Sequence, residues 1–279
     1  MTVAVVTDST CDLSPALVSE LGVTVVPLTV FFGDEAFLDG VEISADQFYE
    51  REKTFRGLPR TSQPSVEQFR AVYQSLAAES KEIVSIHISS RMSGTLNSAS
   101  IAREEFAGEV HIDLIDSHNV SMGLGAVVFE AATVAREGGS LTEVVDAARR
   151  TIDRAHVIAA LDTLEYLRKG GRIGRASSLL GSLLSIKPII HIERGELAPL
   201  ERVRTHARAV ERLVQHATAD QRLKRLFVAA AADEAAALDL IERVRPYLPH
   251  TDIRLGQLGP AVGVHSGPGL LGICTVARE

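Results

Sequence analysis

Four short segments concentrate hydroxyl and carboxylate side chains that could hold a small polar ligand. They are TDST (residues 7–10), TSQPS (61–65), SSRMSGT (89–95) and DSHNVS (116–121). All but TSQPS directly follow runs of residues typical of strands. In open α/β sheets ligands lie beyond the carboxyl ends of the strands, so these segments are expected to converge on one crevice. Taken singly, each cluster is better explained by the commonest task of hydroxyls at such turns, which is to cap a helix; together the clusters favour a binding site.

The segment SSRMSGT carries the most information about the ligand. Its residues Ser93, Gly94 and Thr95 open a helical pattern, LNSASIAREEF. Free N–H groups at the start of a helix favour a small anion, and Gly94 permits close approach to the backbone. The segment lacks G-x-x-x-x-G-K-[ST], and no G-x-G-x-x-G follows the first predicted strand. Because these are the patterns of nucleotide sites, a carboxylate or a single phosphate is favoured over a nucleotide.

Two glycine-rich segments add candidate donors. The stretch GPAVGVHSGPGLLGI places His265 and Ser266 among five glycines and two prolines, a density that predicts sharp turns or close backbone contacts. His265 could donate a hydrogen bond to an anion, or it could be a structural residue of a turn. In RKGGRIGR, Lys169, Arg172 and Arg175 could clasp a phosphate or simply form a solvated basic loop.

The first half of the chain has to position these segments, and its pattern is that of a doubly wound, mostly parallel sheet. Short β-branched runs alternate with amphipathic segments, which is typical of βαβ units. Capping boxes at Ser65 and Ser140 predict helix starts, and Ser44 is expected to cap a short helix through Tyr49. The expected strands are residues 3–6, 23–32, 83–88 and 110–115, with turn residues over 33–39.

The second half predicts a mixed or antiparallel α/β domain. The expected strands are residues 157–161, a hairpin within 187–205, 226–230 and a final pair around 255 and 271–276, with helices over 176–185, 207–219 and 234–247. We therefore divide the chain into an N-terminal α/β domain, residues 1–153, and a C-terminal α/β domain, residues 154–279. No Pro- or Ser-rich linker separates the two, so the ligand is expected in the crevice between them.

Composition excludes several classes of protein. Apolar residues make up 46% and charged residues 23% of the 279 residues, as in ordinary globular chains. The net charge of −7, without a basic block, argues against a nucleic acid partner. The longest apolar stretch is interrupted by Lys187, Pro188 and His191, and no export signal precedes the first strand. We expect a cytoplasmic protein with Cys11 and Cys274 as reduced thiols.

Five motifs in order along the chain carry a resemblance to a known family. VTDSTCDL, TSQPSVEQF, SSRMSGTLNSA, YLRKGGRIGRASSLLGSLLSIKPI and GPAVGVHSGPG resemble the DegV family, the fatty-acid-binding proteins of bacterial fatty acid kinase. The resemblance covers nearly the whole chain. It implies a DegV-like fold of two α/β domains with a long-chain fatty acid held between them. Cys11 is the one departure, because a small residue such as Ala is familiar at that position.

The resemblance also implies roles for individual residues. Thr61 and Ser93 match the family's contacts to the fatty acid carboxylate, with the backbone of Gly94 and Thr95 assisting and His265 beside them. Arg172 and Ser266 belong to the supporting polar network. No cofactor and no metal are implied, and membrane contact is at most transient.

The function implied by the resemblance is that of a carrier without enzymatic activity. An ATP-dependent fatty acid kinase subunit would phosphorylate the bound carboxylate to an acyl phosphate for phospholipid metabolism. Lys187, Arg172 and Arg202 are candidate contacts with the acyl phosphate or with the kinase.

Two other classes of function remain as alternatives. A serine-dependent hydrolase or acyltransferase would use Ser93 with His265 and Asp8, although the nucleophile elbow G-x-S-x-G is absent. A sugar- or nucleotide-binding module is disfavoured because such ligands usually stack on aromatic side chains, and the chain has no Trp and only 5% aromatic residues.

Overall fold

A four-stranded parallel sheet forms the centre of the first half of the chain. The structure, a computed structural model, describes residues 3–180, 186–220 and 222–278. The strands are β1 (Ala4–Asp8), β2 (Thr24–Val26), β6 (Glu82–His87) and β7 (His111–Asp116), in the order β2-β1-β6-β7. The predicted strands at 3–6, 83–88 and 110–115 are thereby confirmed as β1, β6 and β7.

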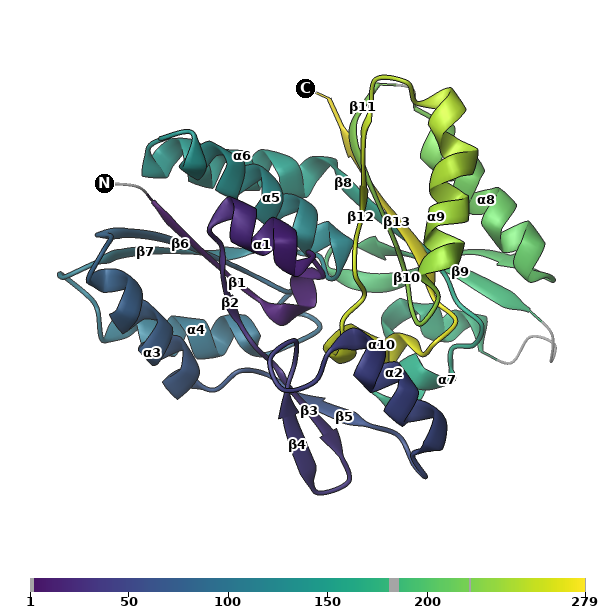
Figure 1. The fold of residues 1–279 in the computed structure, drawn as a ribbon, viewed down its shortest axis with the longest axis horizontal. Helices are drawn as coiled ribbons and strands as arrows, with labels where there is room; N and C mark the ends of the chain where they lie inside the picture. Colours follow the sequence, from purple (N-terminus) through teal and green to yellow (C-terminus); the bar gives the residue numbers. More distant parts are fainter. Residues whose placement is uncertain (1–2, 181–185, 221, 279) are drawn as a thin grey trace.

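Helices cover both faces of this sheet, as expected of a doubly wound fold. Helices α3 and α4 lie on one face, and α1, α5 and α6 lie on the other (Figure 1). The predicted capping boxes are present: Ser65 begins α3 and Ser140 begins α6. The bounds are α1 Pro15–Leu21, α3 Val66–Ala77, α4 Thr95–Glu104, α5 Met122–Arg136 and α6 Leu141–Arg154, with a 3₁₀ turn η1 at Ser9–Cys11.

The single strand expected over residues 23–32 is wrong, because the chain breaks at Pro27. Proline has no N–H to donate to a ladder and restrains the residue before it, so β2 ends at Val26. The chain then enters a separate antiparallel sheet in the order β4-β3-β5. The segment expected as turns, 33–39, supplies one of its strands. The bounds are β3 Thr29–Phe32, β4 Glu35–Leu38 and β5 Arg60–Ser62, and the helix capped by Ser44, α2, runs past Tyr49 as Ala45–Thr54.

The second half is built on a six-stranded mixed sheet in the order β10-β9-β8-β13-β11-β12. Only the β11–β12 pair is parallel. The predicted hairpin is present as β9 and β10. The two strands expected as a final pair, β12 and β13, are not neighbours, because β11 lies between them. The bounds are β8 Ala155–Ala160, β9 Lys187–Glu193, β10 Glu196–Val203, β11 Leu223–Ala230, β12 Asp252–Leu255 and β13 Leu271–Ala277. Together the two halves confirm the predicted fold class.

Helices α8 and α9 cover one face of the six-stranded sheet (Figure 1). Their bounds are α8 His206–Thr218 and α9 Glu234–Val244, and a 3₁₀ turn η3, Arg245–Tyr247, completes the helix expected to end at 247. The helix expected over 176–185 is instead a 3₁₀ helix, η2 Gly174–Leu179, as far as it is described. Its positions 181–185 lie outside the described residues. Two short helices, α7 Glu165–Lys169 and α10 Pro260–Ser266, lie beside the cavity described below.

Helix α5 lies between the two large sheets and is buried along nearly its whole length. It contacts β1 and β6 of the parallel sheet and β8, β11 and β13 of the mixed sheet. A helix that is apolar all round, such as MGLGAVVFEAATVAR, is stable only when it is covered on every side. Its buried Glu130 pairs with Lys224 at 2.6 Å and with Arg225 at 3.1 Å, both on β11. One hydrophobic cluster therefore extends from β1 to β13.

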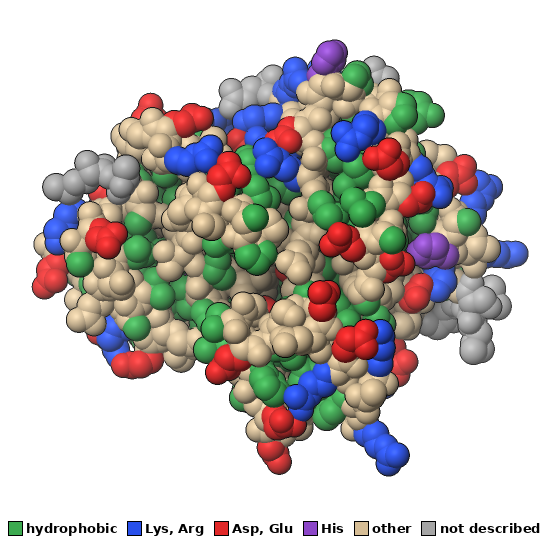
Figure 2. All heavy atoms as spheres, in the orientation of Figure 1, with side chains coloured by type: hydrophobic (Ala, Val, Ile, Leu, Met, Phe, Trp, Pro, Cys, Tyr) green, Lys and Arg blue, Asp and Glu red, His purple; other side chains and the backbone are tan. Residues whose placement is uncertain are grey.

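The surface charges, the cysteines and the helix lengths can be described beside the expectations from composition. On the face drawn in Figure 2, Lys and Arg side chains alternate with Asp and Glu side chains and do not gather into a continuous basic patch. Cys11 and Cys274 are both buried free thiols. None of the helices within the described ranges combines the length and the apolar composition needed to cross a bilayer.

Phe227 on β11 tests how strongly the two halves depend on each other. Its ring is fully buried and lies edge-on to Phe129 of α5, with ring centroids 6.0 Å apart. Phe227→Ala should lower the free energy of unfolding by about 3–5 kcal/mol, because it leaves a cavity between the halves. Urea unfolding followed by circular dichroism measures this loss. Leu238→Ala, at a side chain 46% exposed, should change stability by no more than about 0.5 kcal/mol; equal losses in both variants would contradict the prediction.

Candidate functional site

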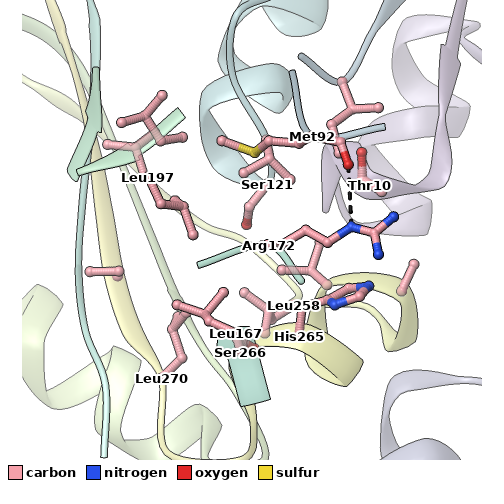
Figure 3. A pocket seen from close by; sticks show the side chains of 18 of the residues that line it. Thr10, Met92, Ser121, Leu167, Arg172, Leu197, Leu258, His265, Ser266 and Leu270 are labelled. Atoms are coloured by element: carbon pink, nitrogen blue, oxygen red, sulfur yellow. Dashed lines mark hydrogen bonds between the residues drawn. The ribbon is translucent and has the colours of Figure 1, made fainter. Parts of the chain in front are cut away.

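A cavity of about 370 Å³ lies where the carboxyl ends of the parallel strands meet the six-stranded sheet. This volume falls within the roughly 300–1,000 Å³ typical of small-molecule sites. Each of the four hydroxyl-rich segments contributes at least one lining residue, namely Thr10, Thr61, Ser93 and Ser121. The predicted convergence of these segments is therefore confirmed. Figure 3 shows Thr10, Arg172 and His265 on one side of the cavity and Leu197 and Leu270 on the other.

The wall formed by the six-stranded sheet is apolar. Two small residues, Ala159 on β8 and Gly272 on β13, are directly paired in the ladder and leave room above the sheet. The cavity is thus apolar over most of its lining and polar at one end. The apolar lining residues include Val157, Ala159, Leu161, Leu167, Ile190, Leu197, Ala229, Leu258, Leu270 and Ile273.

The polar end is organised around a hydrogen bond between Thr61 and His265. Thr61 lies on β5, opposite Val30 of β3, and His265 lies on α10. Although 204 positions separate the two residues in sequence, the distance from Thr61 Oγ1 to His265 Nε2 is 2.8 Å. The fold therefore brings together two of the residues implied by the family resemblance.

Of the two alternatives for the segment around His265, sharp turns or close backbone contacts, the structure shows close contacts, made by helix α10. Pro260 suits the first position of a helix, where no N–H is needed. The glycines serve close packing: a Cβ on Gly263 would lie 2.8 Å from Phe48 Cε1 and 2.8 Å from Tyr49 Oη. Gly267 ends the helix with φ +73° against the ring of Tyr166.

The imidazole of His265 is held in its neutral form. Burial is the main cause that lowers its pKa to about 4, and the nearby positive charge of Arg172 adds to the effect. Its Nδ1 is buried without a hydrogen-bond partner among the described residues. Since an unpaired N–H costs more than an unpaired lone pair, we assign the proton to Nε2. Thr61 Oγ1 then accepts this hydrogen bond, and its own proton is available to a ligand.

Ser93 reaches the cavity, whereas Gly94 and Thr95 lie behind it. Ser93 Oγ is 2.9 Å from Thr95 Oγ1, and the N–H of Thr95 donates to Ser93 Oγ at 3.3 Å. Thr95 is fully buried at the start of α4. A Cβ on Gly94 would lie 2.3 Å from Gln63 Oε1, so this glycine allows Gln63 to cross over it. Thr95 therefore holds the Ser93 hydroxyl, and neither Gly94 nor Thr95 is among the residues that line the cavity.

Arg172 and Ser266 both line the cavity. The exposed Arg172 side chain donates from Nε to the carbonyl of Met92 at 3.3 Å and from Nη1 to the carbonyl of Gly170 at 2.8 Å. It thereby links the loop after α7 to the loop that carries Ser93 (Figure 3). Ser266 is buried and donates to the carbonyl of Gly267 at 3.3 Å.

Lys187 and Arg202, the other two candidate cations, do not line the cavity. Lys187 pairs with Asp162 at 2.6 Å, and Arg202 donates to the carbonyl of Ser178 at 3.0 Å. Among the described residues, no group of three His, Cys, Asp or Glu side chains is arranged to hold a metal ion.

The geometry does not assemble the hydrolase alternative. His265 Nε2 is bonded to Thr61 and not to Ser93, whose hydroxyl faces Thr95. Asp8 is bonded to His87 Nδ1 at 3.0 Å and to the N–H of Ile88 at 3.0 Å. A triad needs its serine hydrogen-bonded to the histidine and its carboxylate to the far nitrogen of the same ring. Neither bond is present.

Gln63 is a lining residue that the sequence did not single out. Its Nε2 donates to Ser98 Oγ at 3.0 Å, so the side chain crosses from β5 to α4. The motif TSQPS contains it, but a glutamine in a loop carries no signal that distinguishes a lining residue from a solvated one.

The fold and cavity define an α/β protein built on two large sheets, with an internal site that is mostly apolar and polar at one end. A family model described as "Uncharacterised protein, DegV family" matches residues 2–278, so the chain belongs to the DegV family. A DegV domain-containing protein of Deinococcus radiodurans is 37% identical over 98% of each chain.

Two solved structures are similar over nearly the full length. A fatty-acid-binding DegV family protein from Thermus thermophilus has a TM-score of 0.92 and 34% identity, with 100% of both chains covered. A stearic acid-binding protein from Eubacterium ventriosum has a TM-score of 0.90 and 26% identity, covering 98% of this chain and 97% of that one.

The protonation of His265 can be followed directly by NMR. Its pKa of about 4 lies below the ordinary value, so the neutral ring contributes stability that is complete above about pH 6.5 and is lost as the pH falls towards 4. The imidazole signal should titrate with a midpoint near 4. His265→Gln should remove this part of the pH dependence of unfolding. A midpoint at or above 6.5 would contradict the assignment of a buried neutral ring.

Proposed function

We propose that this protein binds a long-chain fatty acid and presents its carboxylate to an ATP-dependent kinase. The observation that carries the proposal is the cavity itself, whose apolar wall ends at the Thr61–His265 hydrogen bond. A fatty acid has the same distribution of polarity, with a long apolar tail and one small anionic head. The fatty-acid-binding structures similar to this chain support the same choice of ligand.

The tail supplies most of the affinity in this proposal. Burial of about 14 methylenes at about 0.8 kcal/mol each gives roughly 11 kcal/mol as an upper bound. Each hydroxyl hydrogen bond to the charged head adds about 1.5–3 kcal/mol. We assign these hydrogen bonds to Thr61 and Ser93. The tail therefore determines how tightly the ligand binds, and the head determines its orientation.

The residues at the polar end of the cavity suit a protein that presents the carboxylate to a kinase and does not itself catalyse a reaction. The proposed head contacts are two hydroxyls beside a neutral imidazole, and among the described residues no general base is hydrogen-bonded to Ser93. Arg172, exposed at this end, is the cation placed to meet a developing acyl phosphate. We also propose that the chain acts as two domains, 1–153 and 154–279, with the head group between them and reachable by the kinase.

Mass spectrometry of the denatured, freshly purified protein tests ligand binding. A fatty acid should be released at close to one equivalent per chain, and the delipidated protein should take up stearate. Repeated absence of any lipid from the purified protein, together with failure to take up stearate, would rule out the carrier function.

Replacement of both head contacts tests the orientation of the ligand. Thr61→Ala with Ser93→Ala should leave the fold intact and weaken stearate binding by at least about tenfold, because two hydrogen bonds to a charged group are lost. Phosphorylation of bound stearate by the kinase should fall by at least as much. The matched control is Ser19→Ala with Thr142→Ala, two exposed hydroxyls outside the cavity lining. Full transfer by the first double variant would show that other residues hold the head.

A further inference from the structure

Two buried carboxylates, Asp12 and Asp39, meet at the start of helix α10. Each side chain belongs to a residue only 3% exposed. Asp12 follows η1, and Asp39 follows β4. More than 200 positions separate both residues from α10 in sequence, yet both accept hydrogen bonds from its first backbone groups. Because burial of a carboxylate is costly, its presence at this position calls for a specific task.

These carboxylates act as the N-terminal caps that α10 does not supply itself. The N-cap residue is Gly259, which has no side chain to accept a hydrogen bond. Asp12 Oδ1 accepts from the N–H of Gly259 at 2.8 Å, and Asp39 Oδ2 accepts from the N–H of Ala261 at 3.3 Å. Free N–H groups at a helix start require acceptors, and negative charge is favourable there. Gly259 itself leaves the space: a Cβ on it would lie 3.2 Å from Asp12 Oδ1 and 3.5 Å from Asp39 Oδ1.

The other end of α10 carries His265 and Ser266 into the cavity. Seven residues are too few for a helix to be stable alone, so its position depends on its contacts. Along its sides, Gly263 packs against Tyr49 and Gly267 packs against Tyr166. These contacts hold the sides and the end of the helix. The two hydrogen-bonded carboxylates hold its start.

Asp12 connects α10 to a second part of the cavity. Its Oδ2 accepts a hydrogen bond from the Ser121 hydroxyl, and its backbone carbonyl accepts from the N–H of Gln257 at 3.1 Å. Ser121 lines the cavity in a backbone conformation with φ +56°, which is unfavourable for a residue other than glycine. Asp12 therefore holds a strained lining residue and the start of α10 at the same time.

We propose that Asp12 and Asp39 are positioning residues that set the distance between His265 and Thr61 by fixing the start of α10. This inference rests on the proposed function, in which the Thr61–His265 pair belongs to the head-group site. Neither carboxylate lines the cavity, so both act through the helix and not on the ligand.

The charge of Asp39 changes within a range of pH that can be tested. Burial raises its pKa to about 6, hydrogen bonds from Ser9 and Ala261 oppose the shift, and the charge of Asp8 adds to it. The groups facing the pair from the surrounding elements are Asp8, Cys11 and Tyr49. The folded pKa exceeds the unfolded one, so the contribution of Asp39 to stability is present below about pH 4 and is lost as the pH rises through 6. The capping hydrogen bond changes in the opposite sense, because the ionised group is the stronger acceptor.

Asp39→Asn separates the positioning role from a merely structural one. At pH 7.5 the variant should be at least as stable as the wild type, because a buried charge is removed. Its affinity for stearate should nevertheless fall by about threefold to tenfold. As the pH falls from 7 to 5.5, Asp39 becomes protonated, and the affinity of the wild type for stearate should approach that of the variant. Asp34→Asn, which removes an exposed carboxylate from the turn between β3 and β4, should leave both the stability and the affinity for stearate unchanged.

A double-mutant cycle with His265→Ala shows whether the carboxylates act through the histidine. If they do, Asp39→Asn and Asp12→Ala should each weaken stearate binding in the wild type but have little further effect in the His265→Ala background. Undiminished effects in that background, or no effect in the wild type, would overturn the proposal. Thr61→Ala with Ser93→Ala is measured in parallel. If that variant binds as tightly as the wild type, the assignment of the head contacts has failed. If the wild type does not bind stearate at all, the proposed function has failed and not only the positioning role.

Discussion

The requirement that α5 be covered on all sides governs the rest of the structure. Because this helix has no polar face, the parallel sheet can cover only one of its sides, and the six-stranded sheet must cover another. The buried Glu130, paired with Lys224 and Arg225, ties the helix to β11. The N-terminal end of α5 then falls where strands of both sheets end, and Ser121 and Met122 there line the cavity. The site is thus a consequence of how two sheets share one helix.

The sequence predicts those structural features that depend on interactions between residues close together in the chain. The capping boxes at Ser65 and Ser140 place helix starts correctly because the hydrogen bonds involved span three residues. The break at Pro27 was missed because β-branched residues on both sides of it favour a strand regardless of the sheet that receives it. The glycine density around His265 predicts sharp turns or close backbone contacts, but it cannot name the partners Phe48 and Tyr49, which lie more than 200 positions away. The convergence of the hydroxyl clusters followed from topology, whereas the Thr61–His265 bond and the caps of α10 depend on tertiary contacts.

The polar end of the cavity combines few charges with many fixed dipoles. His265 is neutral because burial and the charge of Arg172 both oppose its protonation. A carboxylate held there would be met by hydroxyl and imidazole dipoles, with Arg172 as the exposed cation beside it. Such an arrangement holds an anion without neutralising it in a buried ion pair, whose formation is costly and whose disruption is strongly unfavourable. This property suits the carrier function proposed above, in which the head group is presented to a kinase.

The pairing of Ala159 with Gly272 makes one wall of the cavity unusually adjustable. Gly272 does not have a positive φ, and a Cβ on it would approach no other heavy atom more closely than 3.5 Å. A larger side chain is therefore tolerated by the backbone, and its extra atoms would be added next to the cavity and not within the packed core. Substitutions that add or remove methyl groups at this pair would therefore leave the ladder between β8 and β13 in place. The depth of the cavity can thus be changed in small steps while the fold that encloses it stays the same.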